Sequence, residues 1–183
     1  MAVDLTSSHF ELFGLPQSFA LDRELLDSRY RELQRTVHPD RFVNAGEQER
    51  RLSLQRAAQI NEGYRVLKDP LRRGRYLLEL EGYPFSDEQH TTNDTEFLTE
   101  QMELREALAG IRTAVDPFMA LGSLMDRIDA DFAALTGELE AGFTGNGCDR
   151  PDAVAATLMK MQFFRRLQEE ALELEALLED EQV

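Results

Sequence analysis

Apolar side chains recur at intervals of three and four residues along almost the whole chain, and this spacing limits the fold to packed helices. One clear stripe consists of Leu26, Tyr30, Leu33 and Val37. On a helix, side chains at these intervals share one face, which a neighbouring element can bury. Alternating runs of β-branched residues are absent, and no Asn-Gly turn lies between strand-like segments. The sequence therefore predicts an all-α protein.

Proline and glycine divide this pattern into separate helices. Pro39 has no backbone N–H and forces His38 out of helical geometry, so a helix should end there. Asp116-Pro117 is the reverse signal, an N-cap followed by proline at the first helical position. The expected helices cover residues 9–13, 22–36, 47–67, 71–80, 94–114, 117 to a glycine-rich loop at 142–147, and 151–179.

The charge of the chain is distributed unevenly. The net charge is −15, yet the first 80 residues are nearly neutral, so almost all of the excess is carried by the remainder. Such asymmetry predicts two modules with different electrostatic tasks. We expect one domain at residues 1–80, a linker at 81–86 and a second domain at 87–183. The acidic half argues against a nucleic-acid partner, which would require a clustered positive surface.

The second half should form a three-helix bundle, because three long amphipathic helices follow one another with short connections. The first helix offers an inner stripe of Phe97, Leu104, Leu108, Ile111 and Val115. The second offers Phe118, Leu121, Met125, Ile128, Phe132, Leu135 and Leu139. The third offers Val154, Leu158, Met161, Phe164, Ala171, Leu174 and Leu178.

Cysteine usage and hydropathy exclude several classes of protein. Cys148 is the single cysteine, so the chain can form no internal disulfide and cannot by itself supply the four thiolates of an iron–sulfur cluster. No paired Cys/His spacing predicts zinc, and we expect neither a metal site nor a cofactor.

No apolar run approaches the ~20 residues of a membrane span, and the first ten residues do not resemble a secretory signal. We therefore expect a cytoplasmic protein without a membrane partner, in which Cys148 has no role.

The tripeptide His38-Pro39-Asp40 is the strongest functional motif, because it occupies a loop between two amphipathic helices. One alternative is that it only turns the chain, with Asp40 as a cap. Another is that His38 and Asp40 form a catalytic pair. The sequence supplies neither a nucleophile nor a third group beside them, which disfavours an enzyme.

With its flanking residues, this motif resembles a J-domain over about the first 75 residues. The resemblance implies that the helices expected at 22–36 and 47–67 form an antiparallel pair. The matching flanks are Phe13-Gly14-Leu15-Pro16, Tyr30, Phe42, Ile60-Asn61, Tyr64, Leu67 and Asp69-Pro70. The resemblance implies that His38, Pro39 and Asp40 dock on a DnaK-type chaperone and accelerate its ATP hydrolysis. A basic face on the preceding helix would steer this docking by charge, and its candidates are Arg29, Arg31, Arg35 and Arg41. A merely solvated helix face is the alternative for each arginine.

The second half extends the resemblance to the HscB family of J-domain co-chaperones. The segments that carry it are Tyr76-Leu77-Leu78-Glu79-Leu80-Glu81-Gly82, Ser86-Asp87-Glu88-Gln89-His90 and the thirteen residues from Asp94 to Glu106. The family resemblance implies that the second domain binds an IscU-type iron–sulfur scaffold protein. The positions that it implies for this contact are Leu98, Met102, Glu103, Glu106 and Phe163.

Helical geometry alone leaves the role of this surface open. Leu98 and Met102 lie four residues apart on a face different from the core stripe, with Glu103 and Glu106 beside them. A wider buried stripe explains this spacing slightly better than a partner-binding face does. Phe163 and Phe164 point about 100° apart on a helix. Because Phe164 fits the inner stripe, we expect Phe163 to be available to a partner.

Two positions depart from the family pattern. Thr99 replaces an apolar residue, and Gly110 replaces an acidic residue, so both are expected to alter scaffold contacts.

The resulting hypothesis is a co-chaperone, not an enzyme, which binds the scaffold, presents it to an HscA/DnaK-type chaperone and stimulates ATP hydrolysis there. The main alternative is a general J-protein that delivers unfolded clients, although no glycine-rich or zinc-binding client domain is evident. A helical adaptor with an inactive J-domain is a further alternative.

Overall fold

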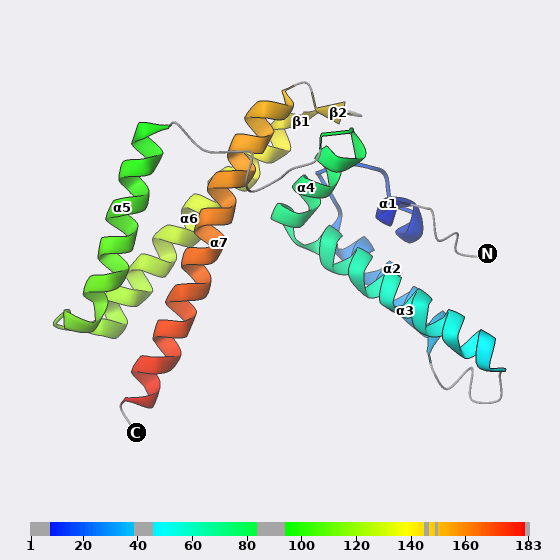
Figure 1. Ribbon diagram of the computed structural model, residues 1–183, viewed down its shortest axis with the longest axis horizontal. Helices are drawn as coiled ribbons and strands as arrows, with labels where there is room; N and C mark the ends of the chain where they lie inside the picture. Colours follow the sequence, from blue (N-terminus) through cyan, green and yellow to red (C-terminus); the bar gives the residue numbers. More distant parts are fainter. Residues whose placement is uncertain (1–7, 39–45, 84–93, 145–146, 149, 182–183) are drawn as a thin grey trace. The chain divides into compact units, whose positions relative to one another are not determined.

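The computed structural model describes residues 8–38, 46–83, 94–144, 147–148 and 150–181, and these residues are predominantly helical as predicted (Figure 1). The elements before residue 84 are α1 (His9–Phe13), α2 (Arg23–Val37), α3 (Glu47–Lys68) and α4 (Pro70–Leu80). The later helices are α5 (Thr95–Gly110), η2 (Ile111–Thr113), α6 (Pro117–Gly142) and α7 (Pro151–Asp180). Two short strands, β1 (Phe143–Thr144) and β2 (Gly147–Cys148), pair between α6 and α7. The sequence Asn146-Gly147 lies between Thr144 and Cys148, so the expectation that no Asn-Gly pair separates strand-forming segments is wrong here.

The chain forms two compact units. Unit 1 contains Met1–Tyr83 together with Phe143–Gly147, and unit 2 contains Pro84–Gly142 together with Cys148–Val183. The sequence pattern predicted only a loop at residues 142–147, and it did not predict that this stretch packs with unit 1. Residues 84–86 of the expected linker lie outside the described residues.

Aspartate caps explain where four of the helices begin. The predicted cap at Asp116 is one of them, because its carboxylate accepts a hydrogen bond from the Met119 backbone N–H at 3.0 Å, at the start of α6. The Asp22 carboxylate accepts a hydrogen bond from the Leu25 backbone N–H at 3.0 Å, at the start of α2. Asp69 caps α4 and Asp94 caps α5 in the same manner. Each cap satisfies a backbone donor that has no partner within the helix.

In unit 1, α2 and α3 form the expected antiparallel pair. Tyr64 donates a hydrogen bond to Asp27 at 2.8 Å, and Ser53 donates to the Val37 carbonyl at 3.0 Å. Partner numbers therefore fall along α3 as they rise along α2. The Tyr30 and Tyr64 rings stack between the two helices at a centroid distance of 4.0 Å. The core of this unit includes Phe10, Phe13, Leu26, Ile60, Leu67, Leu77 and Leu78.

In unit 2, α5, α6 and α7 form the predicted bundle around an apolar core. Its most deeply buried residues include Leu104, Leu121, Ile128, Leu139, Leu158 and Met161. One member of the expected stripe is wrong, because Val115 is fully exposed. The α-helix ends at Gly110, and the chain tightens into η2 and then becomes extended at Ala114. The helical periodicity is lost before residue 115, so Val115 no longer follows the face of Ile111.

Candidate functional site

The outer face of α2 carries the predicted arginines. Arg29, Arg31 and Arg35 are all exposed, while Leu26 and Val37 are buried on the opposite side against the core of unit 1. Arg29 pairs with Glu32 at 3.3 Å, but both side chains are about half exposed or more. Such a surface pair contributes little stability. The charge of this face is therefore accessible to an acidic partner.

His38 terminates α2 and is exposed there as its C-cap residue. The preceding carbonyl, that of Val37, accepts the buried hydrogen bond from Ser53 on α3. This bond anchors the end of α2 and thereby fixes where the tripeptide leaves the helix. Pro39, Asp40 and Arg41, which complete the predicted chaperone-binding set, lie outside the described residues.

The exposed face of α5 carries two large apolar side chains. Leu98 is 41% exposed and Met102 is 65% exposed, and the neighbouring Glu103 and Glu106 are exposed as well. A wider core stripe is thus wrong for Leu98 and Met102, because the buried positions of α5 are Phe97 and Leu104. Apolar groups ringed by carboxylates on an accessible helix face are suited to contact with another protein.

Phe163 is buried, although its angle to Phe164 on the helix predicted that it would be available to a partner. Its side chain is only 9% exposed, and its ring meets Phe97 edge-on at 5.7 Å. Arg105 lies over the same ring at 5.7 Å. The helical wheel failed here because α7 is contacted on two sides, so both Phe163 and Phe164 are covered. Phe163 supports the exposed face of α5 from below.

The two positions that depart from the family pattern are both exposed. The Thr99 hydroxyl donates a hydrogen bond to the Thr95 carbonyl at 2.9 Å, so part of its polarity is satisfied within α5. Gly110 ends α5, and no neighbouring atom lies within 4 Å of the position that a Cβ would occupy. A side chain at residue 110 would therefore be compatible with this backbone.

A groove of about 500 Å³ adjoins the start of α5, and the sequence analysis did not predict it. Its lining residues are Asp94, Glu96, Phe97, Thr99, Glu100, Glu103, Arg127 and Lys160. The signal in the sequence is the row of Glu96, Glu100 and Glu103, which helical spacing places on one side of α5. The cations come from α6 and α7, and no local pattern could reveal their proximity.

Lys160 and Arg127 each hold one carboxylate in this groove. Lys160 pairs with Asp94 at 2.7 Å and lies 5.1 Å above the Phe97 ring. The hydrogen bond from Lys160 is the largest cause of the lowered pKa of Asp94, which also caps α5. Arg127 pairs with Glu100 at 3.3 Å and lies 3.8 Å from Asp131.

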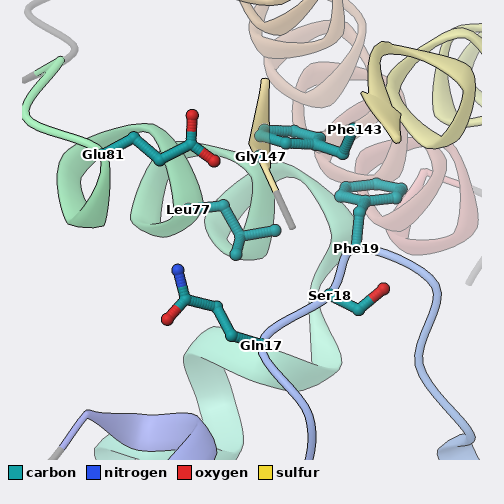
Figure 2. Close-up of a pocket in the computed structure, with 7 residues that line it drawn as sticks. All are labelled: Gln17, Ser18, Phe19, Leu77, Glu81, Phe143 and Gly147. Carbon is teal, nitrogen blue, oxygen red and sulfur yellow. The ribbon is translucent and has the colours of Figure 1, made fainter. Parts of the chain in front are cut away.

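A much smaller hollow of about 10 Å³ lies within unit 1, where Phe143 meets Phe19 (Figure 2). The two rings stack at 5.5 Å with an interplanar angle of 9°, and Arg73 lies 4.7 Å over Phe19. Figure 2 shows Leu77 of α4 beside them, together with Glu81, the C-cap residue of that helix. A cavity of this size admits no more than a water molecule, so it is a packing feature and not a ligand site.

The described residues contain no group of three or more His, Cys, Asp or Glu side chains arranged to hold a metal ion. Within the same residues, no helix is long and apolar enough to cross a bilayer. Cys148 is partly exposed in β2.

Comparisons with known proteins agree along nearly the whole chain. A family model described as the HSCB C-terminal oligomerisation domain matches residues 93–172. The co-chaperone protein HscB homolog of Shewanella oneidensis is 45% identical over 174 residues, which cover 94% of this chain and 99% of that protein. The homolog from Shewanella sp. strain ANA-3 is 43% identical with the same coverage of both chains.

Two solved structures are also similar. The chaperone HscB from Vibrio cholerae matches with a TM-score of 0.80 and 40% identity, over 94% of this chain and 99% of that one. The human co-chaperone protein HscB matches with a TM-score of 0.85 and 30% identity, over 96% of this chain and 85% of that one.

Proposed function

Because the chain belongs to the HscB family of co-chaperones, we propose that it binds an IscU-type iron–sulfur scaffold protein and delivers it to an HscA/DnaK-type chaperone. At the chaperone it stimulates ATP hydrolysis, and it performs no catalysis of its own. The observation that carries the proposal is that the two units expose different kinds of side chain. A basic helix face ending at His38 lies in unit 1, and an apolar face ringed by acids lies on α5 in unit 2.

Chaperone docking is the task of unit 1. Arg29, Arg31 and Arg35 present positive charge on α2, and His38 follows at the end of that helix. Complementary charge raises the rate of encounter with an acidic surface and selects the orientation in which the partner arrives. The remaining members of the proposed docking set, Pro39, Asp40 and Arg41, directly follow His38 in the chain.

Scaffold binding is the task of unit 2. Leu98 and Met102 supply apolar area that water covers in the free protein, and burying it against a partner is favourable. Glu103 and Glu106 would form the polar rim that is typical of such interfaces. Phe163 contributes to scaffold binding indirectly. Its ring lies beneath Arg105 of α5 and so supports the exposed face of that helix.

The test is the ATPase rate of an HscA-type chaperone with this protein, with and without the apo scaffold. We expect stimulation by both together to exceed the sum of the separate effects, and His38→Gln to abolish it. Arg72→Ala, which removes an exposed arginine from α4, is the control for a loss of charge elsewhere in unit 1. Stimulation that is indifferent to the scaffold would instead indicate a general J-protein.

Scaffold binding has its own matched pair of variants. Met102 and Met119 are both exposed methionines of unit 2, at 65% and 68%. Met102→Ala should weaken scaffold binding by about 1–2 kcal/mol, roughly five- to thirtyfold, because an interface anchor is lost. Met119→Ala should leave binding unchanged. Isothermal titration calorimetry measures both, and equal effects would refute the assignment to α5.

A further inference from the structure

The groove beside α5 is only half neutralised by its own cations. Asp94 is paired with Lys160, and Glu100 is paired with Arg127. Among the described residues, the exposed carboxylates of Glu96 and Glu103 form no ion pair. Two uncompensated negative charges therefore border about 500 Å³ of open space.

Two cationic side chains of the protein, Lys160 and Arg127, already lie in the groove. Lys160 places its ammonium 5.1 Å above the Phe97 ring, which gives the groove an aromatic floor attractive to positive charge. The guanidinium of Arg127 lies between a carboxylate of α5 and one of α6, at 3.3 Å from Glu100 and 3.8 Å from Asp131. A lysine or arginine side chain from a partner would meet the same chemistry at the two carboxylates that remain.

The groove borders the apolar face of α5. Its lining includes Thr99 and Glu103, which directly follow Leu98 and Met102 in the helix, although Leu98 and Met102 do not line it themselves. A partner seated on Leu98 and Met102 would reach the groove across Thr99 and Glu103. Unit 2 contains most of the acidic excess of a chain whose net charge is −15, which favours a basic partner surface.

We propose that this groove receives a lysine or arginine side chain of the scaffold protein between Glu96 and Glu103, with Arg127 as a competing internal cation. The proposal rests on the proposed scaffold binding and extends it to Glu96, Glu100 and Arg127, which the family resemblance did not single out. Arg127 then limits affinity, since its pairing with Glu100 keeps one carboxylate from the partner.

The experiment is calorimetric titration of the apo scaffold into the full chain and four variants, at ionic strengths of about 0.05 M and about 0.5 M. Glu96→Gln should weaken binding about two- to fivefold at low salt, and the difference should shrink at high salt. Glu173→Gln removes one equally exposed carboxylate from α7 and is the control for net charge. It should change the affinity less than Glu96→Gln does.

Arg127→Gln gives the sharper result, because it should tighten binding about two- to fivefold at low salt by releasing Glu100. Damage to the fold could only weaken binding, so a gain has no trivial structural explanation. Unchanged affinities in both Glu96→Gln and Arg127→Gln would overturn the groove proposal. If Met102→Ala weakens binding in the same series, scaffold binding on α5 survives that failure. If the unaltered chain does not bind the scaffold, the proposed function fails as well.

Discussion

At the scale of single residues, the polar side chain of His9 packs inside unit 1. Its ring lies against Tyr76 at a centroid distance of 4.5 Å, and its Nδ1 atom is buried without a hydrogen-bond partner. Burial lowers the pKa of His9 below its ordinary value of 6.5, although Glu62 and Glu79 oppose part of the shift. The folded state of unit 1 therefore favours the neutral form of the His9 imidazole.

The pH dependence follows from this preference. Below about pH 6.5 the unfolded chain binds a proton at His9 that the folded chain resists, so stability falls as the pH drops from 7 towards 5 and levels off below the folded pKa. His9→Gln should remove this component of the loss. Urea denaturation of both proteins at pH 7 and pH 5.5 measures it, and parallel losses in the two proteins would contradict the assignment to His9.

At the scale of helices and strands, Gly63 explains the close approach of α1 to α3. A Cβ at this position would lie 3.0 Å from the Phe13 ring and 3.2 Å from His9 Nδ1. Glycine within a helix costs about 0.5–1 kcal/mol relative to alanine. The chain accepts that cost at Gly63 because a larger residue would push α1 away.

Gly63→Ala should thus destabilise the protein by about 1–3 kcal/mol through overpacking. Gly122→Ala should stabilise it by about 0.5–1 kcal/mol, because the position lies in α6 with no atom within 4 Å of a new Cβ. Thermal unfolding of the two variants compares them directly. A stabilising Gly63→Ala would show that α1 does not pack against α3 as closely as described.

The helices themselves were largely predictable, because their limits are encoded locally. The expected helices at 22–36 and 71–80 begin within one residue of the observed starts of α2 and α4, where Asp22 and Asp69 provide the caps. Val115 and Phe163 were placed wrongly because their environments depend on where the chain turns and what covers it. The groove with Arg127 was not predictable at all, since its residues come from three helices far apart in sequence.

At the scale of the whole molecule, the units are not continuous stretches of sequence. Phe143 follows α6, yet it belongs by packing to unit 1, where it stacks on Phe19. Stacked aromatic pairs contribute about 0.5–1.5 kcal/mol beyond the area that they bury. A segment from the acidic second half of the sequence therefore contributes to the stability of unit 1.

Phe143→Ala should therefore reduce the stability of unit 1 by at least about 1 kcal/mol, because the stacking and the buried apolar area of the ring are both lost. Native-state hydrogen exchange should show faster exchange of the α4 amides, with α5 little affected. Phe132→Ala is the matched control, because Phe132 is a half-buried phenylalanine of unit 2, as Phe143 is of unit 1, and its ring lies 5.0 Å from the Arg165 guanidinium. The control should affect unit 2, and the opposite pattern would contradict the division of the chain.

The displaced position of Phe143 has a consequence for protein engineering. A fragment that stops at Tyr83 keeps Phe19 and Arg73 but leaves one face of the Phe19 ring in water. Such a fragment is an incomplete module, and weak activity in it would reflect lost packing as well as the absence of unit 2, to which we assign scaffold binding. A transplantable version needs a surrogate for Phe143, either a grafted hairpin or a polar residue in place of Phe19. The unit that can be exchanged between proteins is therefore discontinuous in sequence.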